Sequence, residues 1–251
     1  MSERRPHLRF DSLEGNGRPP DQKRHPVLRS DPDLLAAVPA EHRRLALRAC
    51  LAPVVEVAAG HWTPPAQDPS GLGLLIVSGT LCRRVHHGRQ HGAELLGPGD
   101  LLRPGDGIDE WSSIESDAAW HAINGARVAL LDAEFARRAA HFPGLSVAFV
   151  HRALLRSRYL AVLLAIAGER RVDSRLEMVF WHLADRFGSR CGDWVKVPVP
   201  VTHGVLSELV AARRPSVTTA MGRLESAGLV VRSGDGWRLL ASMATNRPHA
   251  G

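Results

Sequence analysis

The chain contains 251 residues, which is enough for two modest domains that each bury a core of their own. Its formal net charge of +6 suits a polyanionic partner, although many basic proteins never meet nucleic acid. The sequence has no long apolar run and no signal-peptide core, which argues against a membrane-spanning protein and predicts a cytoplasmic one.

The three cysteines, Cys50, Cys82 and Cys191, lie far apart and form no Cys-x-x-Cys pair. This spacing gives no support for a zinc site or an iron–sulfur cluster. It favours buried free thiols in a reducing compartment. We therefore expect no metal and no cofactor.

Residues 1–27 are predicted to form a disordered basic tail, because they are rich in Arg, Pro, Gly and Asp and lack apolar periodicity. Added phosphate contacts and an inert, solvated extension are both compatible with its charge. The basic residues in or just after the tail are Arg4, Arg5, Arg9, Arg18, Lys23, Arg24 and Arg29.

Residues 28–138 are predicted to form an N-terminal antiparallel double-sheet roll. Helical spacing at 34–38 and 42–51 comes first, and short apolar segments punctuated by Gly and Pro follow. Tight turns are predicted at Ser78-Gly79 and at Gly97-Pro98-Gly99-Asp100. The expected strands cover 54–57, 74–77, 81–85, 93–96 and 128–131. The run from 75 to 81, followed by 96–100, resembles the β-roll of cyclic-nucleotide-binding domains.

A metal-binding cupin-like sensor or enzyme is an alternative interpretation of this region. His86, His87, His91 and Glu94 lie on or beside one predicted hairpin, and three imidazoles with a carboxylate can bind a metal. However, a cupin needs two histidines one residue apart, and adjacent residues of a strand point to opposite faces. An exposed polar hairpin is the simpler interpretation.

Residues 139–168 are predicted to form a long helix that is interrupted near its start by Phe142-Pro143-Gly144. Apolar and small residues recur at alternating spacings of three and four, which is typical of a coiled-coil seam. We expect this helix to form a parallel homodimer. The predicted interface residues are Val147, Val150, Leu154, Ser157, Ala161 and Leu164.

Residues 169–241 are predicted to form a winged helix-turn-helix. A charged hinge leads into an amphipathic helix at 176–187, and Thr202 then suits the start of a first short helix. Small residues at 211–212 make the turn, and Pro215 suits the first position of a second helix that ends at Gly228. Gly234-Asp235-Gly236 indicates a hairpin between two apolar segments. Residues 242–251 are expected to be frayed.

The second helix is expected to read DNA, because a helix in the major groove contacts base edges with residues near its N-terminus. A helical hairpin that serves only for packing, with solvated arginines, is the alternative. The candidate DNA-binding residues are Thr202, His203, Arg213, Arg214, Ser216, Thr218, Thr219, Arg223 and Arg232, with Arg238 near phosphate on the wing.

This segment resembles the C-terminal domain of the Crp/Fnr family of bacterial transcription regulators. Arg213-Arg214-Pro215-Ser216-Val217 and the run at 223–230, Arg-Leu-Glu-Ser-Ala-Gly-Leu-Val, carry the resemblance, and the second match is the closer one. The family often has an acidic residue at the place of Pro215 and a base-reading arginine at the place of Thr219. Because a carboxylate would accept from cytosine N4, we expect a different target sequence here. The family also often carries an Asp-x-Arg pair at the place of Asp173 and Arg175, with a structural role.

In members of the family that bind cyclic AMP, a glutamate holds the ribose and an arginine holds the phosphate. This chain has no counterpart of that arginine after Asp100, and acidic Glu115 and Asp117 lie near its place. An anion without a cationic partner is disfavoured in a closed pocket. We therefore expect no useful affinity for cyclic AMP or cyclic GMP.

Together these patterns predict an α+β protein with a cyclic-nucleotide-binding-like β-roll, a dimerisation helix and a winged helix-turn-helix. The expected function is that of a homodimeric regulator that binds double-stranded DNA at a two-fold symmetric site. No nucleophile–base spacing indicates an enzyme. The ligand-binding residues are unknown, and a small organic effector, a protein effector or none at all stay open.

Overall fold

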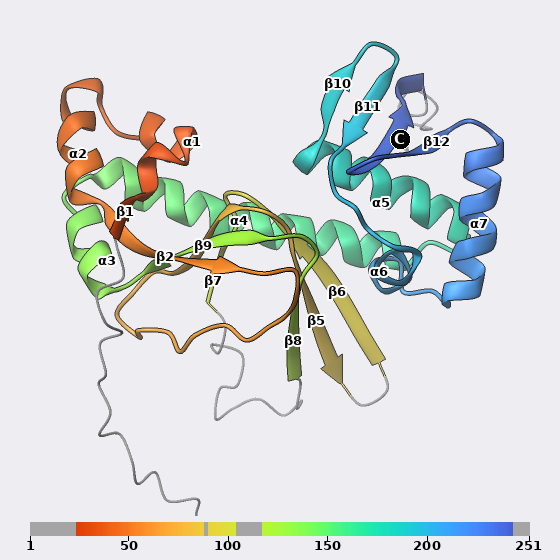
Figure 1. The fold of residues 1–251 in the computed structure, drawn as a ribbon, viewed down its shortest axis with the longest axis horizontal. Helices are drawn as coiled ribbons and strands as arrows, with labels where there is room; N and C mark the ends of the chain where they lie inside the picture. Colours follow the sequence, from red (N-terminus) through yellow and green to blue (C-terminus); the bar gives the residue numbers. More distant parts are fainter. Residues whose placement is uncertain (1–23, 88–89, 104–116, 243–251) are drawn as a thin grey trace, which may run out of the picture.

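The computed structural model describes residues 24–87, 90–103 and 117–242. Figure 1 shows helix α4 (Pro143–Ala167) running from the N-terminal helices at one end of the molecule toward α5, α6 and α7 at the other. A two-sheet roll lies beside this helix. The architecture is therefore α+β, with an antiparallel N-terminal domain and a C-terminal helix-turn-helix.

One sheet of the roll has the strand order β1-β2-β9-β4-β7 and the other has β3-β8-β5-β6, with all neighbours antiparallel. The first sheet contains β1 (Arg24–Pro26), β2 (Leu51–Val57), β4 (Gly73–Ser78), β7 (Leu101–Leu102) and β9 (Ala126–Leu131). The second contains β3 (Gly60–Trp62), β5 (Leu81–His87), β6 (Gln90–Leu96) and β8 (Asp117–Ala122).

The first sheet is buried on both faces, which explains the continuous apolar run in β4. Leu74 and Ile76 point into the core between the two sheets, whereas Leu75 points to the other face because successive side chains alternate. That other face is covered by helical residues such as Leu28, Phe135 and Phe149. The covering elements are η1 (Val27–Arg29), α1 (Pro32–Ala36), η2 (Ala40–His42), α2 (Arg43–Ala49), α3 (Ala133–Ala139) and the first turns of α4.

The predicted turns of the roll are confirmed. Gly79 joins β4 to β5 with φ of 83°, a left-handed conformation that favours glycine. The Asp100 N–H donates to the carbonyl of Gly97 at 3.0 Å and closes the second turn. The predicted break in the long helix is also confirmed, because α3 ends at Ala139 and α4 begins at Pro143.

Three expectations are corrected. Residues 24–26 were assigned to a disordered tail, but they pair with β2, and Arg24 forms ion pairs with Asp132 at 2.6 Å and Glu134 at 2.8 Å. Cys50 and Cys82 are buried as expected, whereas Cys191 is exposed. Strand β8 and helix α3 were not predicted. The rest of the tail, Glu115 and residues 243–251 lie outside the described residues.

The C-terminal part combines three helices with a four-stranded sheet of order β10-β11-β13-β12. The helices are α5 (Val172–Phe187), α6 (His203–Leu209) and α7 (Arg214–Ser226). The strands are β10 (Ser189–Cys191), β11 (Trp194–Val197), β12 (Val230–Ser233) and β13 (Gly236–Leu240). No helix in the described part of the chain is long and apolar enough to cross a membrane.

Candidate nucleic-acid interface

Helix α6 supports the recognition helix from behind. Its N-cap is Thr202, as predicted, and the hydroxyl of this residue accepts the backbone N–H of Val205 at 3.3 Å. Val205, Leu206 and Leu209 are buried in the core of the domain. Since α6 has only seven residues, this side-chain cap and the apolar face fix it more than its own backbone bonds do.

The turn between α6 and α7 is tied to the hinge by Arg175. Among the described residues other than glycine, Ala211 alone has a positive φ, 49°. The guanidinium of Arg175 donates to the carbonyls of Val210 at 3.0 Å and Ala211 at 3.1 Å. Its Nε donates to the carbonyl of Glu169 at 2.6 Å. Arg175 therefore links the residue that follows the long helix to the turn that orients α7.

Helix α7 presents a cationic tip. Arg213 is the N-cap and Pro215 the second helical residue, one position later than predicted. Val217, Ala220, Met221 and Leu224 are buried, while Arg213, Arg214 and Ser216 are exposed. The first turn contains no acidic residue, so the positive end of the helix dipole adds to the two arginines. Gly228 ends the helix with φ of 66°, as predicted.

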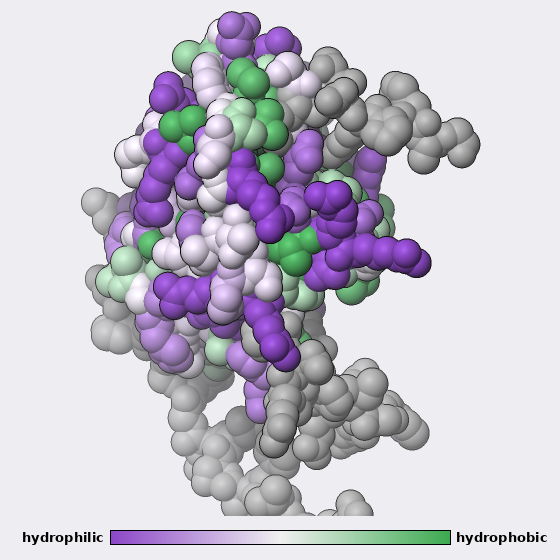
Figure 2. Space-filling view, turned by 90° about the vertical axis from the view of Figure 1, so that its right-hand side faces the viewer, coloured by the Kyte–Doolittle hydropathy of each residue, from purple (hydrophilic) through white to green (hydrophobic). Residues whose placement is uncertain are grey.

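The structure brings several of the candidate residues together at this tip. Nδ1 of His203 lies 3.3 Å from the hydroxyl of Thr218, which joins the start of α6 to the second turn of α7. Thr219 is exposed, but its hydroxyl donates to the carbonyl of Pro215 at 3.1 Å within the helix. Figure 2 shows long hydrophilic side chains projecting from the side of the molecule that carries α7.

Arg223 does not join this cluster. It lies nine residues after Arg214, about 13 Å farther along the helix. One of its nitrogens is 3.0 Å and 3.1 Å from the two carboxylate oxygens of Asp173 on α5. The predicted Asp-x-Arg pair, Asp173 and Arg175, therefore anchors both α7 and the turn that precedes it.

The wing is a two-stranded hairpin with Gly234 and Asp235 in its loop, as predicted. The Arg232 guanidinium lies 5.5 Å from the centre of the Trp237 ring, and Arg238 lies 5.4 Å from that of Trp194. Lys196, which is 3.2 Å from Asp235, adds a cation that the sequence did not reveal, because strand β11 was not predicted.

The seam of α4 is uncovered in the single chain. Its apolar members are largely exposed: Val147 by 69%, Val150 by 60%, Leu154 by 63% and Leu164 by 76%. Ser157 and Ala161, which complete the seam, are exposed as well. The opposite face of the helix buries Leu145, Phe149, Leu163 and Ile166. A contiguous apolar stripe of this kind on a monomer marks an interaction surface.

Glu94 lies in a buried ion-pair network and not on an exposed polar hairpin. One of its oxygens is 2.6 Å from Nε of Arg83 on β5 and 2.7 Å from Nη2 of Arg156 on α4. His86 pairs instead with His91 at the far end of the hairpin. The four residues of the metal hypothesis therefore do not converge, and no group of metal ligands occurs within the described ranges.

Two further ion pairs join the roll to the helix-turn-helix. Arg84 on β5 contacts Glu208 on α6 at 2.6 Å, and Arg186 on α5 contacts Asp100 at 2.5 Å. Burial raises the pKa of the Asp100 carboxyl, and the neighbouring Arg186 opposes that shift. Cys82 and Leu95 of the roll belong to the same apolar cluster as α5 and α6. Burial raises the pKa of the Cys82 thiol to about 11, which makes it a poor nucleophile.

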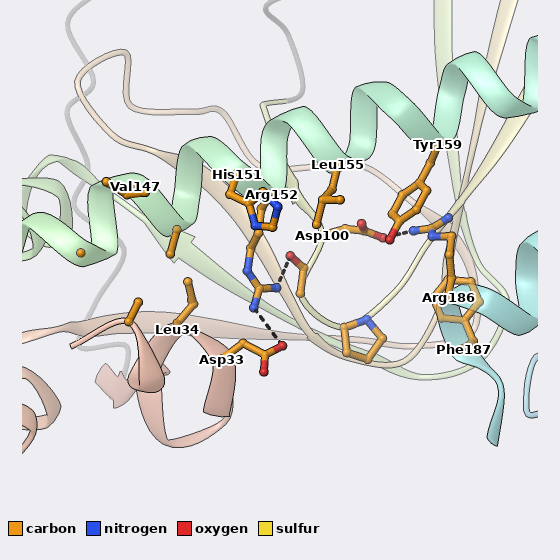
Figure 3. A pocket seen from close by; sticks show the side chains of 15 residues that line it. Asp33, Leu34, Asp100, Val147, His151, Arg152, Leu155, Tyr159, Arg186 and Phe187 are labelled. Atoms are coloured by element: carbon orange, nitrogen blue, oxygen red, sulfur yellow. Dashed lines mark hydrogen bonds and ion pairs between the residues drawn. The ribbon is translucent and has the colours of Figure 1, made fainter. Parts of the chain in front are cut away.

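A cavity of about 540 Å³ lies between α1, the turn at 97–100, α4 and the end of α5. Its arginines are already occupied, as Figure 3 shows in part. Arg152 donates to the carbonyl of Gly99 at 2.6 Å and to Asp31 at 2.7 Å, and Arg186 lies over the Tyr159 ring at 4.5 Å. Because the polar groups of this cavity satisfy one another, its lining does not define a ligand class.

Taken together, α6, the turn, the cationic α7 and the wing define a DNA-binding protein of the winged helix-turn-helix class. Residues 174–242 match the family of Crp-like helix-turn-helix domains. This segment is therefore a Crp-like helix-turn-helix domain, and the chain has the fold of Crp/Fnr transcription regulators.

Solved structures support this fold across most of the chain. A cyclic nucleotide-binding domain containing protein from Listeria monocytogenes EGD-e is similar with a TM-score of 0.62 and 14% identity, covering 75% of this chain and 89% of that one. FixK2 from Bradyrhizobium japonicum is similar with a TM-score of 0.59 and 14% identity, covering 80% and 99%. A CRP-family transcriptional regulator from Thermus thermophilus gives 0.51 and 18%, covering 76% and 93%. No curated protein matches the sequence.

Proposed function

We propose that this protein is a homodimeric transcription regulator that reads a two-fold symmetric DNA site through α7. The exposed apolar seam of α4 carries the proposal. A parallel pair of these helices would cover the seam and would relate two α7 tips by a two-fold axis. Such a dimer reads half-sites roughly 34 Å apart. The division into a roll, a dimerisation helix and a DNA-binding domain gives each part its role, and DNA as the partner implies the cytoplasm.

The proposed DNA contacts divide into two groups. Arg213 and Arg214 combine two exposed guanidiniums with the positive end of a helix, which suits guanine edges or phosphate. Thr202, His203, Ser216, Thr218 and Thr219 surround them, and Arg232 and Arg238 lie on the wing. Arg223, which pairs with Asp173, is assigned mainly to the orientation of α7.

The proposed control of this dimer is reciprocal coupling between the roll and the helix-turn-helix. The Arg84–Glu208 and Arg186–Asp100 pairs connect the strands and turn of the roll directly to α6 and α5. Arg175 connects the hinge to the turn before α7. A change in the roll would therefore reach α7 by contacts that do not pass through the dimer helix alone.

Cyclic AMP and cyclic GMP are not proposed as effectors. The chain has no counterpart of the phosphate-binding arginine, and the roll places Arg83 and Arg156 on Glu94. Titration calorimetry should show no saturable micromolar binding of either nucleotide, and such binding would contradict the proposal. Elemental analysis of the purified protein tests the metal-binding alternative, because a metal-dependent sensor or enzyme would retain stoichiometric metal.

Selection of genomic DNA fragments by the purified protein tests the main proposal. The selection uses ligand-free protein at near-physiological salt, since affinity for DNA depends steeply on salt. Enrichment of a two-fold symmetric site is the expected result. If light scattering shows a monomer at working concentration and only sequence-independent binding is found, the proposal fails.

A further inference from the structure

The N-terminal end of the molecule carries an open depression of about 400 Å³. It is formed by the end of β1, the helical turn η1, helix α2 and the start of β2. Its volume is in the range of small-molecule sites, roughly 300–1,000 Å³. The lining residues are Pro26, Arg29, Arg44, Leu47, Arg48 and Leu51.

The charge of this lining is one-sided. Arg29, Arg44 and Arg48 contribute three guanidiniums, and no carboxylate lines the depression. Within the part of the chain that the structure describes, none of the three makes an ion pair or a hydrogen bond. Arg44 and Arg48 are also four residues apart on one helix, a spacing at which like charges destabilise each other.

The acidic groups nearby are already taken. Asp132 and Glu134 pair with Arg24, and Glu134 also pairs with Arg138. The neighbouring Arg43 donates to the carbonyl of Val38 at 3.0 Å. The cavity beside α4 differs in the same way, because both of its arginines have acidic partners. The depression on α2 is thus a cluster of arginine donors without an acceptor from the chain.

We propose that this depression binds a small organic molecule with two or more negative charges, of the carboxylate or phosphate kind. Guanidiniums fork onto such groups with paired hydrogen bonds. Pro26, Leu47 and Leu51 offer an apolar floor for the carbon skeleton of the ligand. Figure 1 places α2 and α7 at opposite ends of the molecule, so this surface is distinct from the one proposed to read DNA.

The site also has a physical route to the rest of the protein. Val27 and Leu28 of η1 and Ala46 of α2 belong to one apolar core with Leu145 and Phe149 of α4. A ligand that draws Arg29 toward Arg44 and Arg48 would therefore act on elements packed against the first turns of α4. This inference goes beyond the proposed reading of DNA and does not depend on it.

Titration calorimetry with pyrophosphate and with citrate, at constant ionic strength, tests the proposal on the full chain. Saturable binding of at least one probe, at one site per chain, is expected for the wild type. R44Q/R48Q should weaken it by about tenfold or more, and R29Q should weaken it from the other side of the depression. Circular dichroism checks that each variant is folded, and R29Q alone decides the matter if R44Q/R48Q is not.

Two matched controls separate this site from other cations. R170Q/R190Q removes two exposed arginines elsewhere, and R213Q/R214Q removes the tip of α7; both should leave the affinity within about twofold of the wild type. The proposal is overturned if neither probe binds the wild type, if R44Q/R48Q and R29Q bind as the wild type does, or if R213Q/R214Q abolishes binding. Binding of an acidic peptide but of neither probe would also overturn it, in favour of a protein partner.

Discussion

At the scale of single residues, Arg214 offers the sharpest test of DNA reading. It is exposed at the first position of α7, beside a helix end that has no acidic residue. We expect Arg214→Ala to weaken binding to the selected site by roughly 1–3 kcal/mol if the side chain forks onto a base. Competition titrations on the selected site and on random DNA measure this loss. Equal losses on both would show that Arg214 touches only phosphate, and Arg190→Ala is the control for removing one exposed charge.

His182 makes a residue-scale prediction about pH. It is buried against Tyr159, its Nε2 has no partner, and burial followed by the charge of Arg186 lowers its pKa to about 4. Because the unfolded chain would bind the proton near pH 6.5, the stability contributed by neutral His182 is present above that pH and is lost as the pH falls toward 4.

Between pH 7 and pH 5 the loss from this one residue should be roughly 2 kcal/mol. Urea unfolding of the wild type and of His182→Phe at both pH values measures it, because other titrating groups contribute equally to the two proteins. The variant should lose less stability than the wild type over this interval. Identical losses would show that His182 is protonated in the folded protein.

At the scale of elements, α4 has one face in the core and one apolar seam in solvent. We expect Leu154→Glu to convert the protein to a monomer, because it places a charge in the middle of the proposed seam. Analytical ultracentrifugation measures the change, and DNA affinity should fall with it. Val162→Glu, at an apolar residue that is 38% exposed but off the seam, is the control and should remain a dimer. A dimeric Leu154→Glu would exclude this seam as the interface.

At the scale of the whole molecule, the roll and the helix-turn-helix are joined by charges that can be exchanged. Glu208→Arg would place two guanidiniums face to face at the 2.6 Å contact with Arg84 and should separate α6 from the roll. Small-angle scattering should then show a larger radius of gyration, and DNA affinity should change by about 1–3 kcal/mol. The swap Arg84→Glu with Glu208→Arg should restore both. Failure of the swap to restore either quantity would show that the pair does not couple the domains.

The sequence predicted those elements whose pattern is local. The apolar run in β4, the cap at Thr202 and Gly228 at the end of α7 are confirmed because each depends on neighbouring residues. Strand β8, with the sequence Asp-Ala-Ala-Trp-His-Ala, has no β-branched residue and forms because β3 and β5 pair with it on both sides. Strand β1 contains an Arg and a Pro and was missed for the same reason.

The same distinction holds for the site. The exposed arginines of α7 follow from helical spacing, whereas the contact of His203 with Thr218 joins residues 15 positions apart. The pairing of Arg223 with Asp173 spans 50 positions, and that of Arg84 with Glu208 spans 124. Such contacts depend on how helices and sheets pack, and no local pattern encodes them.

The uncovered seam of α4 has a consequence for how steeply the protein would respond to its own abundance. If only the dimer reads a symmetric site, then below the dimer dissociation constant the number of competent molecules rises with the square of the protein concentration. A twofold change in synthesis would give about a fourfold change in occupied sites. Four exposed side chains, Val147, Val150, Leu154 and Leu164, would thereby set a threshold on gene output without any small molecule.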